Sequence, residues 1–203
     1  MTKKIHIVSF DVPYPANYGG VIDVFYKIKS LHASGVEIYL HTFEYGKGKQ
    51  QELNNYCKKV FYYPRNSFLK SFLSTNPFVV STRTNKDLIK NLLLDENPIL
   101  FEGLHTTFPI LDNQLNGKKK FIRAHNIEHL FYKGLAKSES NIFKRLFFNQ
   151  EAKKLKRYEK VFNKTQGVFS ISRIEQDYFK KKYGDKCVYI PAFHDTKNHT
   201  SLK

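Results

Sequence analysis

The spacing of apolar side chains along the first part of the chain predicts a strand, a loop, a helix and a second strand. Residues 4–10 are rich in β-branched and aromatic side chains, as strands are. Two prolines and a Gly-Gly pair in residues 11–20 end this strand. From Val21 to Leu31 the apolar positions form one face of a helix, which Gly35 should end. A strand over residues 36–43 completes a βαβ unit, whose crossover is right-handed and whose strands are parallel.

The same alternation continues to residue 190 and sets the expected fold class. Further strands are expected at residues 59–63, 98–101, 119–124, 167–171 and 187–190. Helices are expected at residues 49–56, 85–94, 105–115, from about 127, at 141–164 and at 173–183, with a less regular stretch at 64–84. This pattern predicts an α/β, Rossmann-like, open and mostly parallel sheet of about seven strands with helices on both faces. Residues 1–191 should form one domain, and residues 192–203 read as a linker or a frayed tail.

The composition indicates where the protein is located and what kind of molecule it binds. With 203 residues and 41% hydrophobic side chains the chain can bury a core, and no apolar run is long enough to span a bilayer. The first residues lack a signal-peptide core, so we expect a cytoplasmic protein, and Cys57 and Cys187 should be two ordinary buried thiols. Residues 118–203 hold 21 Lys and Arg against 8 Asp and Glu, whereas residues 1–117 hold 13 against 10. This asymmetry indicates an anionic partner: nucleic acid, an acidic lipid surface or a phosphate-bearing substrate.

The stretch from Arg123 to His129 is the first candidate site. It lies between a predicted strand and a predicted helix, at the kind of junction where open α/β sheets bind ligands. His125 is the main catalytic candidate, because an imidazole there can exchange a proton or hold a sugar hydroxyl or phosphate near neutral pH. Arg123 and Asn126 are expected to contact substrate. The alternative is structural: His125 caps the next helix, or Asn126 is the N-cap of that helix.

Two further positions should share this edge of the sheet. Gly19 and Gly20 follow the first strand and open the first helix, where backbone N–H groups favour a phosphate or a sugar hydroxyl, although a plain turn could also use glycine. Glu102 ends the strand at 98–101, three residues before His105, and is expected to contact substrate. Its alternative role is a solvated acid or a salt-bridge partner of a lysine. In a parallel sheet these residues and His125 lie at the same edge.

A metal site is not expected. His125-x-x-Glu128-His129 matches the His-x-x-Glu-His pattern of inverted zinc peptidases. That site needs a third protein ligand and a motif that lies within a helix, whereas His125 directly follows a strand. The lysine-rich helices at 153–157 and 180–182 are either solvated faces or a contact for anionic lipid headgroups, and binding of nucleic acid is not expected.

Several strings resemble the N-terminal domain of GT-B glycosyltransferases, in particular the retaining, nucleotide-sugar-using group called family four. The strings are Pro13-Tyr14-Pro15 with Gly19-Gly20, Leu31-x-x-x-Gly35-Val36-Glu37-Ile38, Arg123-Ala-His-Asn-Ile-Glu-His129 with Tyr132, Glu151-Ala-x-x-Leu155-x-x-Tyr158-Glu159, and Phe169-Ser-Ile-Ser172. The most specific of them is the 123–129 string, which closely resembles that of a bacterial branch of the family. The resemblance covers about Lys4 to Phe193.

The resemblance implies an acceptor-binding half of a two-domain bacterial enzyme that makes a surface polysaccharide or glycolipid. It implies that His125 is the active-site histidine, that Gly19 and Gly20 approach the donor diphosphate or the acceptor, and that no metal or other cofactor is bound. The donor, a nucleotide-sugar, would be held mainly by a second half. The acceptor would be a saccharide or a lipid-linked molecule, and the enzyme would often sit on the inner membrane face.

The donor-binding half has no counterpart in the 203 residues, so we expect this chain, as a fragment or a truncated gene product, to be inactive alone. A nicotinamide-dependent dehydrogenase is one alternative. It would use the same βαβ opening with Glu44 on the ribose, but the third glycine is missing and Glu44 lies beyond the usual spacing of about 20 residues. A non-catalytic basic module that binds lipid or nucleic acid is another.

Overall fold

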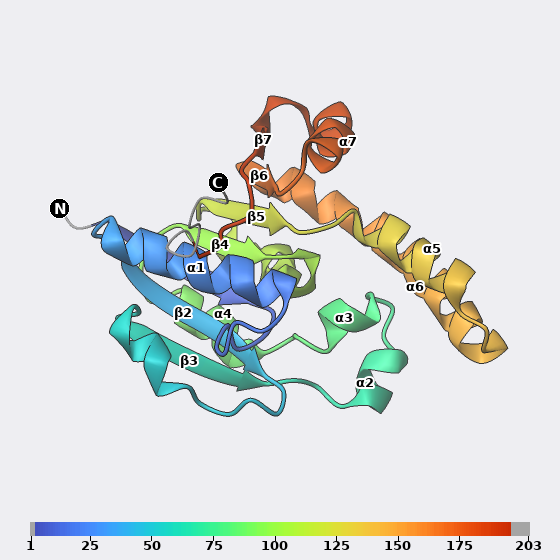
Figure 1. Ribbon diagram of the computed structural model, residues 1–203, viewed down its shortest axis with the longest axis horizontal. Helices are drawn as coiled ribbons and strands as arrows, with labels where there is room; N and C mark the ends of the chain where they lie inside the picture. The colour runs from blue at the N-terminus through green and yellow to red at the C-terminus, as the bar shows by residue number, and fades with distance from the viewer. Residues whose placement is uncertain (1–2, 196–203) are drawn as a thin grey trace, which may run out of the picture.

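A computed structural model describes residues 3–195 and contains a single sheet of seven strands (Figure 1). The strand order is β3-β2-β1-β4-β5-β6-β7, and every neighbouring pair is parallel. The strands are β1 (Lys4–Ser9), β2 (Glu37–Glu44), β3 (Lys59–Pro64), β4 (Ile99–Glu102), β5 (Lys120–Ala124), β6 (Gly167–Ser170) and β7 (Cys187–Tyr189). The predicted fold class is therefore confirmed, and each predicted strand is present.

The helices lie in the connections, as the alternation predicts. They are α1 (Gly19–Ala33), α2 (Phe68–Phe72), α3 (Phe78–Ser81), α4 (Lys86–Leu92), α5 (Glu128–Ser138), α6 (Ile142–Tyr158) and α7 (Arg173–Tyr183), with 3-10 turns η1 (Gln51–Asn55), η2 (Leu104–Thr106), η3 (Phe108–Leu111), η4 (Asn113–Leu115), η5 (Glu159–Lys164) and η6 (Gly184–Lys186). None of the described helices is long and apolar enough to cross a membrane.

Each face of the sheet has its own hydrophobic core. On one face α1 buries Val24, Phe25 and Ile28 against β1 and β2. On the other face the core residues come from α4, α6, η5 and α7, with Leu88, Leu155, Phe162 and Phe179 among them. Because apolar residues of the strands point alternately to the two faces, helices must cover both. Cys57 and Cys187 are buried free thiols, one in each core, as predicted.

Four connections differ from the sequence prediction. The helix expected at 49–56 is only the 3-10 turn η1. The helix expected at 105–115 is instead the three 3-10 turns η2, η3 and η4, because Pro109 lacks an N–H and Asp112 starts a new turn by accepting a hydrogen bond from the N–H of Gln114. The long helix expected at 141–164 is α-helical only to Tyr158 and then tightens into η5. The irregular stretch 64–84 contains the two short helices α2 and α3.

Helices α5 and α6 form an antiparallel hairpin that projects away from the sheet (Figure 1). Asn141 begins α6, since its side chain accepts hydrogen bonds from the N–H groups of Phe143 and Lys144. The hairpin leaves the sheet directly after β5 and returns to it before β6. It therefore begins beside the carboxyl edge of the sheet, where the predicted site residues lie.

Residues 190–193 fold back from β7 toward α1. The N–H of Phe193 donates a hydrogen bond to Asp23 in α1, and the carbonyls of Ile190 and Pro191 accept hydrogen bonds from Arg123. Of the tail predicted at 192–203, residues 192–195 are described, and the remainder lies outside the described residues.

Candidate functional site

A cavity of about 570 Å³ opens at the carboxyl edge of the sheet, where β1, β4 and β5 end and α1 begins. Aromatic and aliphatic side chains form much of its wall, and polar groups enter it from α1, η2 and the segment after β5. The lining residues are Phe10, Tyr18, Gly19, Gly20, Asp23, His105, His125, Asn126, Phe131, Ile171 and Ala192. An apolar pocket with a few convergent polar groups at this edge is the expected form of a ligand site in an open α/β sheet.

His125 follows β5 directly, and its side chain is nearly buried in the cavity wall. Its Nε2 atom lies 3.1 Å from the Oε2 atom of Glu102 and 3.9 Å from the Oδ2 atom of Asp23. A carboxylate accepts hydrogen bonds only, so Nε2 carries the proton in this contact. Among residues 3–195, Nδ1 of His125 has no hydrogen-bond partner, so this nitrogen is the one available to a ligand.

Two basic and two acidic side chains form a buried ionic cluster beneath His125. Lys27 donates hydrogen bonds to Asp23 (2.9 Å) and to both oxygens of Glu102 (2.8 and 3.0 Å). Arg123 donates a bidentate pair to Asp23 (3.1 and 2.9 Å). Each buried charge has opposite partners within hydrogen-bond distance, which is the condition for tolerating such groups in a core.

The cluster keeps both carboxyl groups ionised. Burial by itself would raise the pKa of Asp23, but Lys27 and Arg123 outweigh burial, and the pKa lies below its ordinary value. For Glu102 burial also opposes ionisation, and Lys27 and then His125 lower the pKa overall. Glu102 is therefore a fixed anion behind His125, and it orients the imidazole ring.

Asp23, Glu102 and His125 place ligand atoms within 4.8 Å of one another, which is close enough for a metal ion. Lys27 occupies the space between the two carboxylates, and Arg123 neutralises Asp23 from the other side. An added divalent cation would meet these two positive charges. The donor set therefore does not fit a metal ion. His125 and His129, the two histidines of the zinc-peptidase pattern, also diverge, since Nδ1 of His129 lies 3.3 Å from Glu159 in a separate cluster.

Gly19 and Gly20 form the first turn of α1 at the cavity. Tyr18 is the N-cap, but its side chain does not cap the helix, because its hydroxyl donates to Asp11 (2.8 Å), and no acidic residue lies in the first turn. A Cβ atom on Gly20 would lie 2.8 Å from the Cζ atom of Phe10, so only glycine lets this aromatic wall approach the helix. An uncapped helix N-terminus with close access to the backbone favours an anionic or hydroxyl-bearing ligand.

A second ionisable pair includes His105, which lines the cavity together with His125. Nε2 of His105 is 3.9 Å from Oε2 of Glu128, which is buried at the start of α5. Burial raises the pKa of Glu128 to about 7, against the opposing effects of Asn126 and Arg83. Burial and then the charge of Arg83 hold the pKa of His105 well below its usual value. The pair therefore adds a carboxyl group that can change its charge near neutral pH.

The predicted site residues divide into two groups. Gly19, Gly20, His125 and Asn126 line the cavity. Glu102 is fully buried behind His125, so its described contact to the cavity runs through that imidazole. Arg123 is 1% exposed, and all three of its guanidinium nitrogens are bonded to Asp23 or to the backbone of residues 190–191. The structure therefore does not bring the Arg123 side chain to the cavity.

The hypothesis that Asn126 or His125 caps α5 is wrong. The N-cap is Ile127, and no side chain caps that helix, so the carboxamide of Asn126 is exposed at the cavity. Sequence reasoning missed Asp23 and Lys27 altogether. The available signal was their spacing of four residues on α1, where each directly precedes a buried apolar residue, Val24 or Ile28. An ion pair on a buried helix face requires partners elsewhere in the fold.

Other residues of the resemblance strings have structural roles. Glu151 accepts a hydrogen bond from the N–H of Phe78 (2.5 Å) and so holds the start of α3. The hydroxyls of Tyr158 and Thr107 lie 3.3 Å apart. Glu159 accepts hydrogen bonds from Tyr178, Lys182 and Tyr183 of α7. These contacts join α6 and η5 to α3, to Thr107 and to α7.

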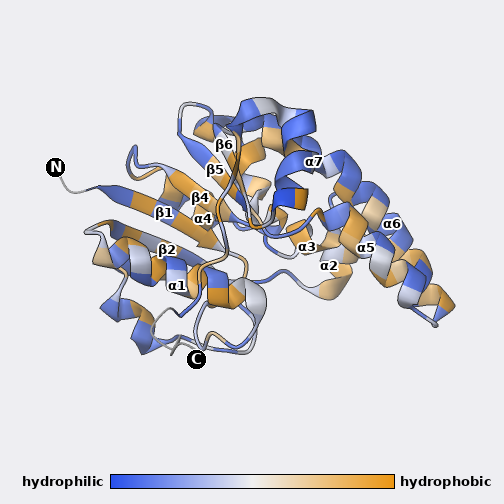
Figure 2. Cartoon of the chain, turned by 45° about the horizontal axis from the view of Figure 1, so that its top comes forward, coloured by the Kyte–Doolittle hydropathy of each residue, from blue (hydrophilic) through white to orange (hydrophobic). Residues whose placement is uncertain are grey.

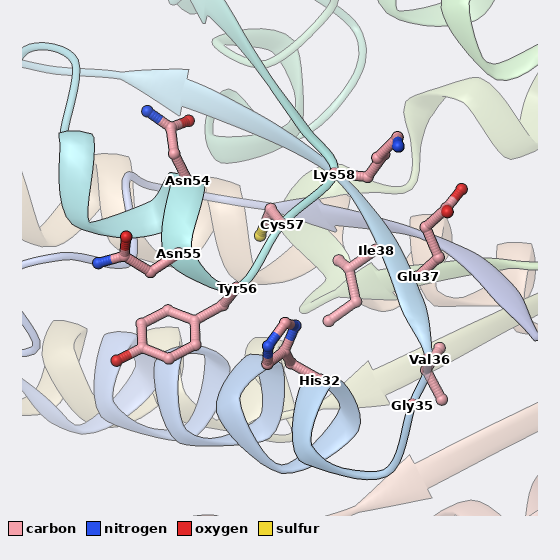
Figure 3. A pocket seen from close by; sticks show the side chains of 10 residues that line it. All are labelled: His32, Gly35, Val36, Glu37, Ile38, Asn54, Asn55, Tyr56, Cys57 and Lys58. Carbon is pink, nitrogen blue, oxygen red and sulfur yellow. The ribbon is translucent and has the colours of Figure 1, made fainter.

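A second cavity, of about 300 Å³, lies at the opposite edge of the sheet, between the end of α1 and η1 (Figure 3). The His32 and Tyr56 rings meet edge to face, 5.8 Å apart. The carboxamides of Asn54 and Asn55 and the carboxylate of Glu37 point away from His32 (Figure 3). The polar groups of this second cavity therefore do not converge on a common point, unlike those around His125.

The chain is similar in sequence to a curated protein of unassigned function. A protein of Klebsiella pneumoniae, described as an uncharacterized 44.6 kDa protein in the cps region, is 31% identical over 202 residues, which cover 96% of this chain and 52% of that protein. The chain thus spans about half the length of this curated relative. No protein-family model matches the chain.

Among solved structures, UGT2 of Phytolacca americana in complex with UDP-2fluoro-glucose and pterostilbene superposes with a TM-score of 0.53 at 12% identity, over 93% of this chain and 53% of UGT2. The apo form of UGT2 gives a TM-score of 0.52 at 10% identity, over 93% of this chain and 51% of UGT2. At this identity the likeness concerns the fold. The chain therefore shares the fold of the matched half of UGT2 and has a Rossmann-like sheet.

Proposed function

We propose that this chain is the acceptor-binding half of a retaining glycosyltransferase. The enzyme would move a sugar from a nucleotide-sugar to a saccharide or lipid-linked acceptor in the synthesis of a bacterial surface polysaccharide or glycolipid. The observation that carries the proposal is the contact between His125 and the buried anion of Glu102 at the wall of a cavity in a glycosyltransferase-like fold. The family resemblance of the 123–129 string supports the retaining class and the role in surface glycans.

The geometry suggests a division of labour within the site. Glu102 and Lys27 hold the ring of His125, and Nδ1 of His125 binds a hydroxyl of the sugar that is transferred or of the acceptor. The N–H groups of Gly19 and Gly20 bind a phosphate or a second hydroxyl at the start of α1. Phe10 and Phe131 supply apolar contact area. The nucleotide would be held mainly by a second half of the enzyme, and the reaction would take place on the cytoplasmic side.

The dehydrogenase alternative keeps one supporting observation. Glu44 is the last residue of β2 and is exposed, which is where a dinucleotide fold places the carboxylate that binds ribose. Binding of NADH, followed by its fluorescence, is therefore the test of this alternative. Binding of NADH that Glu44→Gln abolishes and His125→Ala leaves intact would favour the dehydrogenase.

The test uses a protein in which this chain is followed by a donor-binding half, such as a protein of the length of the Klebsiella relative. It is incubated with a panel of nucleotide-sugars and with lipid extract or oligosaccharides as acceptors, and release of free nucleotide is measured. We expect turnover that His125→Ala lowers by about 10²-fold, in the range typical of a lost positioned catalytic group. His129→Ala, a histidine of the same string outside the cavity, should stay within about threefold, since its contact is structural. The anomeric configuration of the product then tests retention. Unchanged turnover in the His125→Ala protein would refute the proposal.

A further inference from the structure

Large apolar side chains are exposed together on α2 and on the α5–α6 hairpin. We call this surface the hairpin patch and define it by Phe68, Leu69, Phe72 and Leu73 of α2 and its C-cap, and by Ile142, Phe143 and Leu146 of α6. Phe143 is 79% exposed and Leu73 is 75% exposed. Single exposed apolar residues are ordinary, but a gathering of this size on one side of a protein marks a surface that binds something.

Aromatic contacts join the two parts of the hairpin patch. The rings of Phe72 in α2 and Phe147 in α6 stack with their centroids 6.0 Å apart. Phe78 of α3 bridges them, at 5.2 Å from Phe68 and 5.8 Å from Phe147. The patch is therefore one surface held by its own aromatic cluster, although α2 and α6 are about 70 residues apart in the sequence.

The surroundings of the hairpin patch are basic. Exposed Lys70, Lys144 and Arg145 lie within the same helices as the apolar residues. Residues 130–157 contain eight Lys and Arg but only two acids, Glu139 and Glu151, and Glu151 is buried. Hydrophobic and hydrophilic positions alternate along α5 and α6 (Figure 2). Apolar side chains interleaved with lysines on a helix surface match an anionic bilayer, whose headgroups attract the charge and whose acyl boundary accepts the apolar groups.

The apolar surface also reaches the cavity. Phe131, in the first turn of α5, lines the cavity and is 50% exposed. Its neighbour Tyr132 contacts Phe148 of α6, with ring centroids 6.0 Å apart. Phe148 in turn lies 5.7 Å from Phe147 in the aromatic cluster of the patch. A row of neighbouring aromatic rings along α5 and α6 thus connects the hairpin patch with the cavity wall.

We propose that the hairpin patch binds the surface of an anionic lipid bilayer and brings the cavity to it. This assignment rests on the proposed function in one respect only: an acceptor drawn from the bilayer would be lipid-linked. The binding itself requires no glycosyl transfer. A nucleic acid would need basic groups with stacking or base-reading side chains, whereas Leu69, Leu73, Ile142 and Leu146 are aliphatic and suit acyl chains.

The experiment is co-sedimentation of the 203-residue chain with vesicles of phosphatidylcholine mixed with phosphatidylglycerol, and with vesicles of phosphatidylcholine alone. We expect binding to the anionic vesicles that weakens as salt is raised, and at least about tenfold weaker binding to the neutral ones. Phe143→Ser with Leu146→Ser should weaken binding to anionic vesicles about tenfold or more. Lys144→Glu with Arg145→Glu should do the same through charge.

Variants of α7 are matched controls that test whether vesicle binding depends on the hairpin patch or on any exposed apolar or basic residue. Ile174 is 80% exposed and lies outside the hairpin patch, and Lys180 and Lys181 are exposed bases there. Ile174→Ser, and Lys180→Glu with Lys181→Glu, should each bind anionic vesicles within about threefold of the unaltered chain. Circular dichroism should show that every variant is folded.

Equal losses of vesicle binding in the α7 and hairpin variants would overturn the proposal, as would unchanged vesicle binding in the hairpin variants. Light scattering that shows the patch closing a dimer, or tighter binding to an oligonucleotide than to vesicles, would also overturn it. His125→Ala should bind vesicles as the unaltered chain does, so failure of the catalytic proposal and failure of this one give different results.

Discussion

His125 and His129 stand four residues apart in one string, yet each belongs to a different buried cluster. His125 precedes α5, faces Glu102, and joins a cluster with Asp23, Lys27 and Arg123 that contacts the cavity. His129 lies within α5 and faces Glu159, which also binds Tyr178, Lys182 and Tyr183 of α7. The start of the helix at Glu128 turns the two imidazoles in different directions.

The two clusters differ in the solvent exposure of their cationic side chains. Lys27 and Arg123 are both buried, so they depend on Asp23 and Glu102 for the whole of their neutralisation. Lys182 is 37% exposed and can return to water if Glu159 is lost. The first cluster is thus a rigid support for a cavity residue, whereas the second connects α5, η5 and α7 and tolerates rearrangement.

The largest expected effect is the loss of an anion from the first cluster. Asp23→Ala should lower the free energy of unfolding by about 3–5 kcal/mol, because it leaves Arg123 buried without its bidentate partner and removes one acceptor of Lys27. Glu159→Ala should cost about 1–3 kcal/mol, because Lys182 can be hydrated. Urea titration followed by circular dichroism measures both values.

Lys90→Ala is the control for that pair of variants. Its ion pair with Asp87 is largely exposed on α4, so its removal should change stability by less than about 0.5 kcal/mol. If Glu159→Ala lowers the free energy of unfolding as much as Asp23→Ala does, then the partial exposure of Lys182 does not make its cluster more tolerant than the buried one.

The next prediction concerns Glu128, the partner of His105, through which the stability of the fold should depend on pH. Folding raises the pKa of Glu128 from 4.5 to about 7, so the stability of the protonated form is fully present below pH 4.5 and is lost as the pH rises through 7. Glu128→Gln keeps the neutral form at every pH. We expect the variant to match the unaltered chain at pH 5 and to be about 1–3 kcal/mol more stable at pH 8, by urea titration at the two pH values. An identical difference at both pH values would show that Glu128 ionises freely in the folded chain.

The sheet could be predicted from the sequence because its signals are local. Each strand is a short apolar run bounded by turn residues, and the βαβ rule then makes neighbouring strands parallel. The 3-10 turns between β4 and β5 and the end of α6 at Tyr158 were predicted less well, since a helical spacing does not tell an α-helix from successive tighter turns.

The site could be predicted only in part, for a related reason. Gly19, Gly20, His125 and Asn126 lie directly after strands, and strand ends at one edge of a parallel sheet are necessarily close together. The partners of Arg123 are 100 residues before it in α1 and 67 residues after it at Ile190, and no local pattern reports such contacts. The sequence therefore indicates which residues reach the cavity edge, but not which of them are enclosed by distant segments.

The smallest expected effect separates Asn126 from Asn141, the two asparagines that flank α5 and α6. Asn141 caps α6 through two backbone N–H groups, so Asn141→Ala should cost about 1 kcal/mol. Asn126 lies one residue before the N-cap Ile127 and is exposed at the cavity, so Asn126→Ala should change stability by less than about 0.5 kcal/mol. If Asn126 contacts substrate, as the sequence predicts, the same variant should weaken acceptor binding severalfold, as measured by KM in the nucleotide-release assay, while Asn141→Ala leaves KM unchanged. A stability loss in Asn126→Ala equal to that in Asn141→Ala would show that Asn126 supports α5 after all, and that its position at the cavity is incidental.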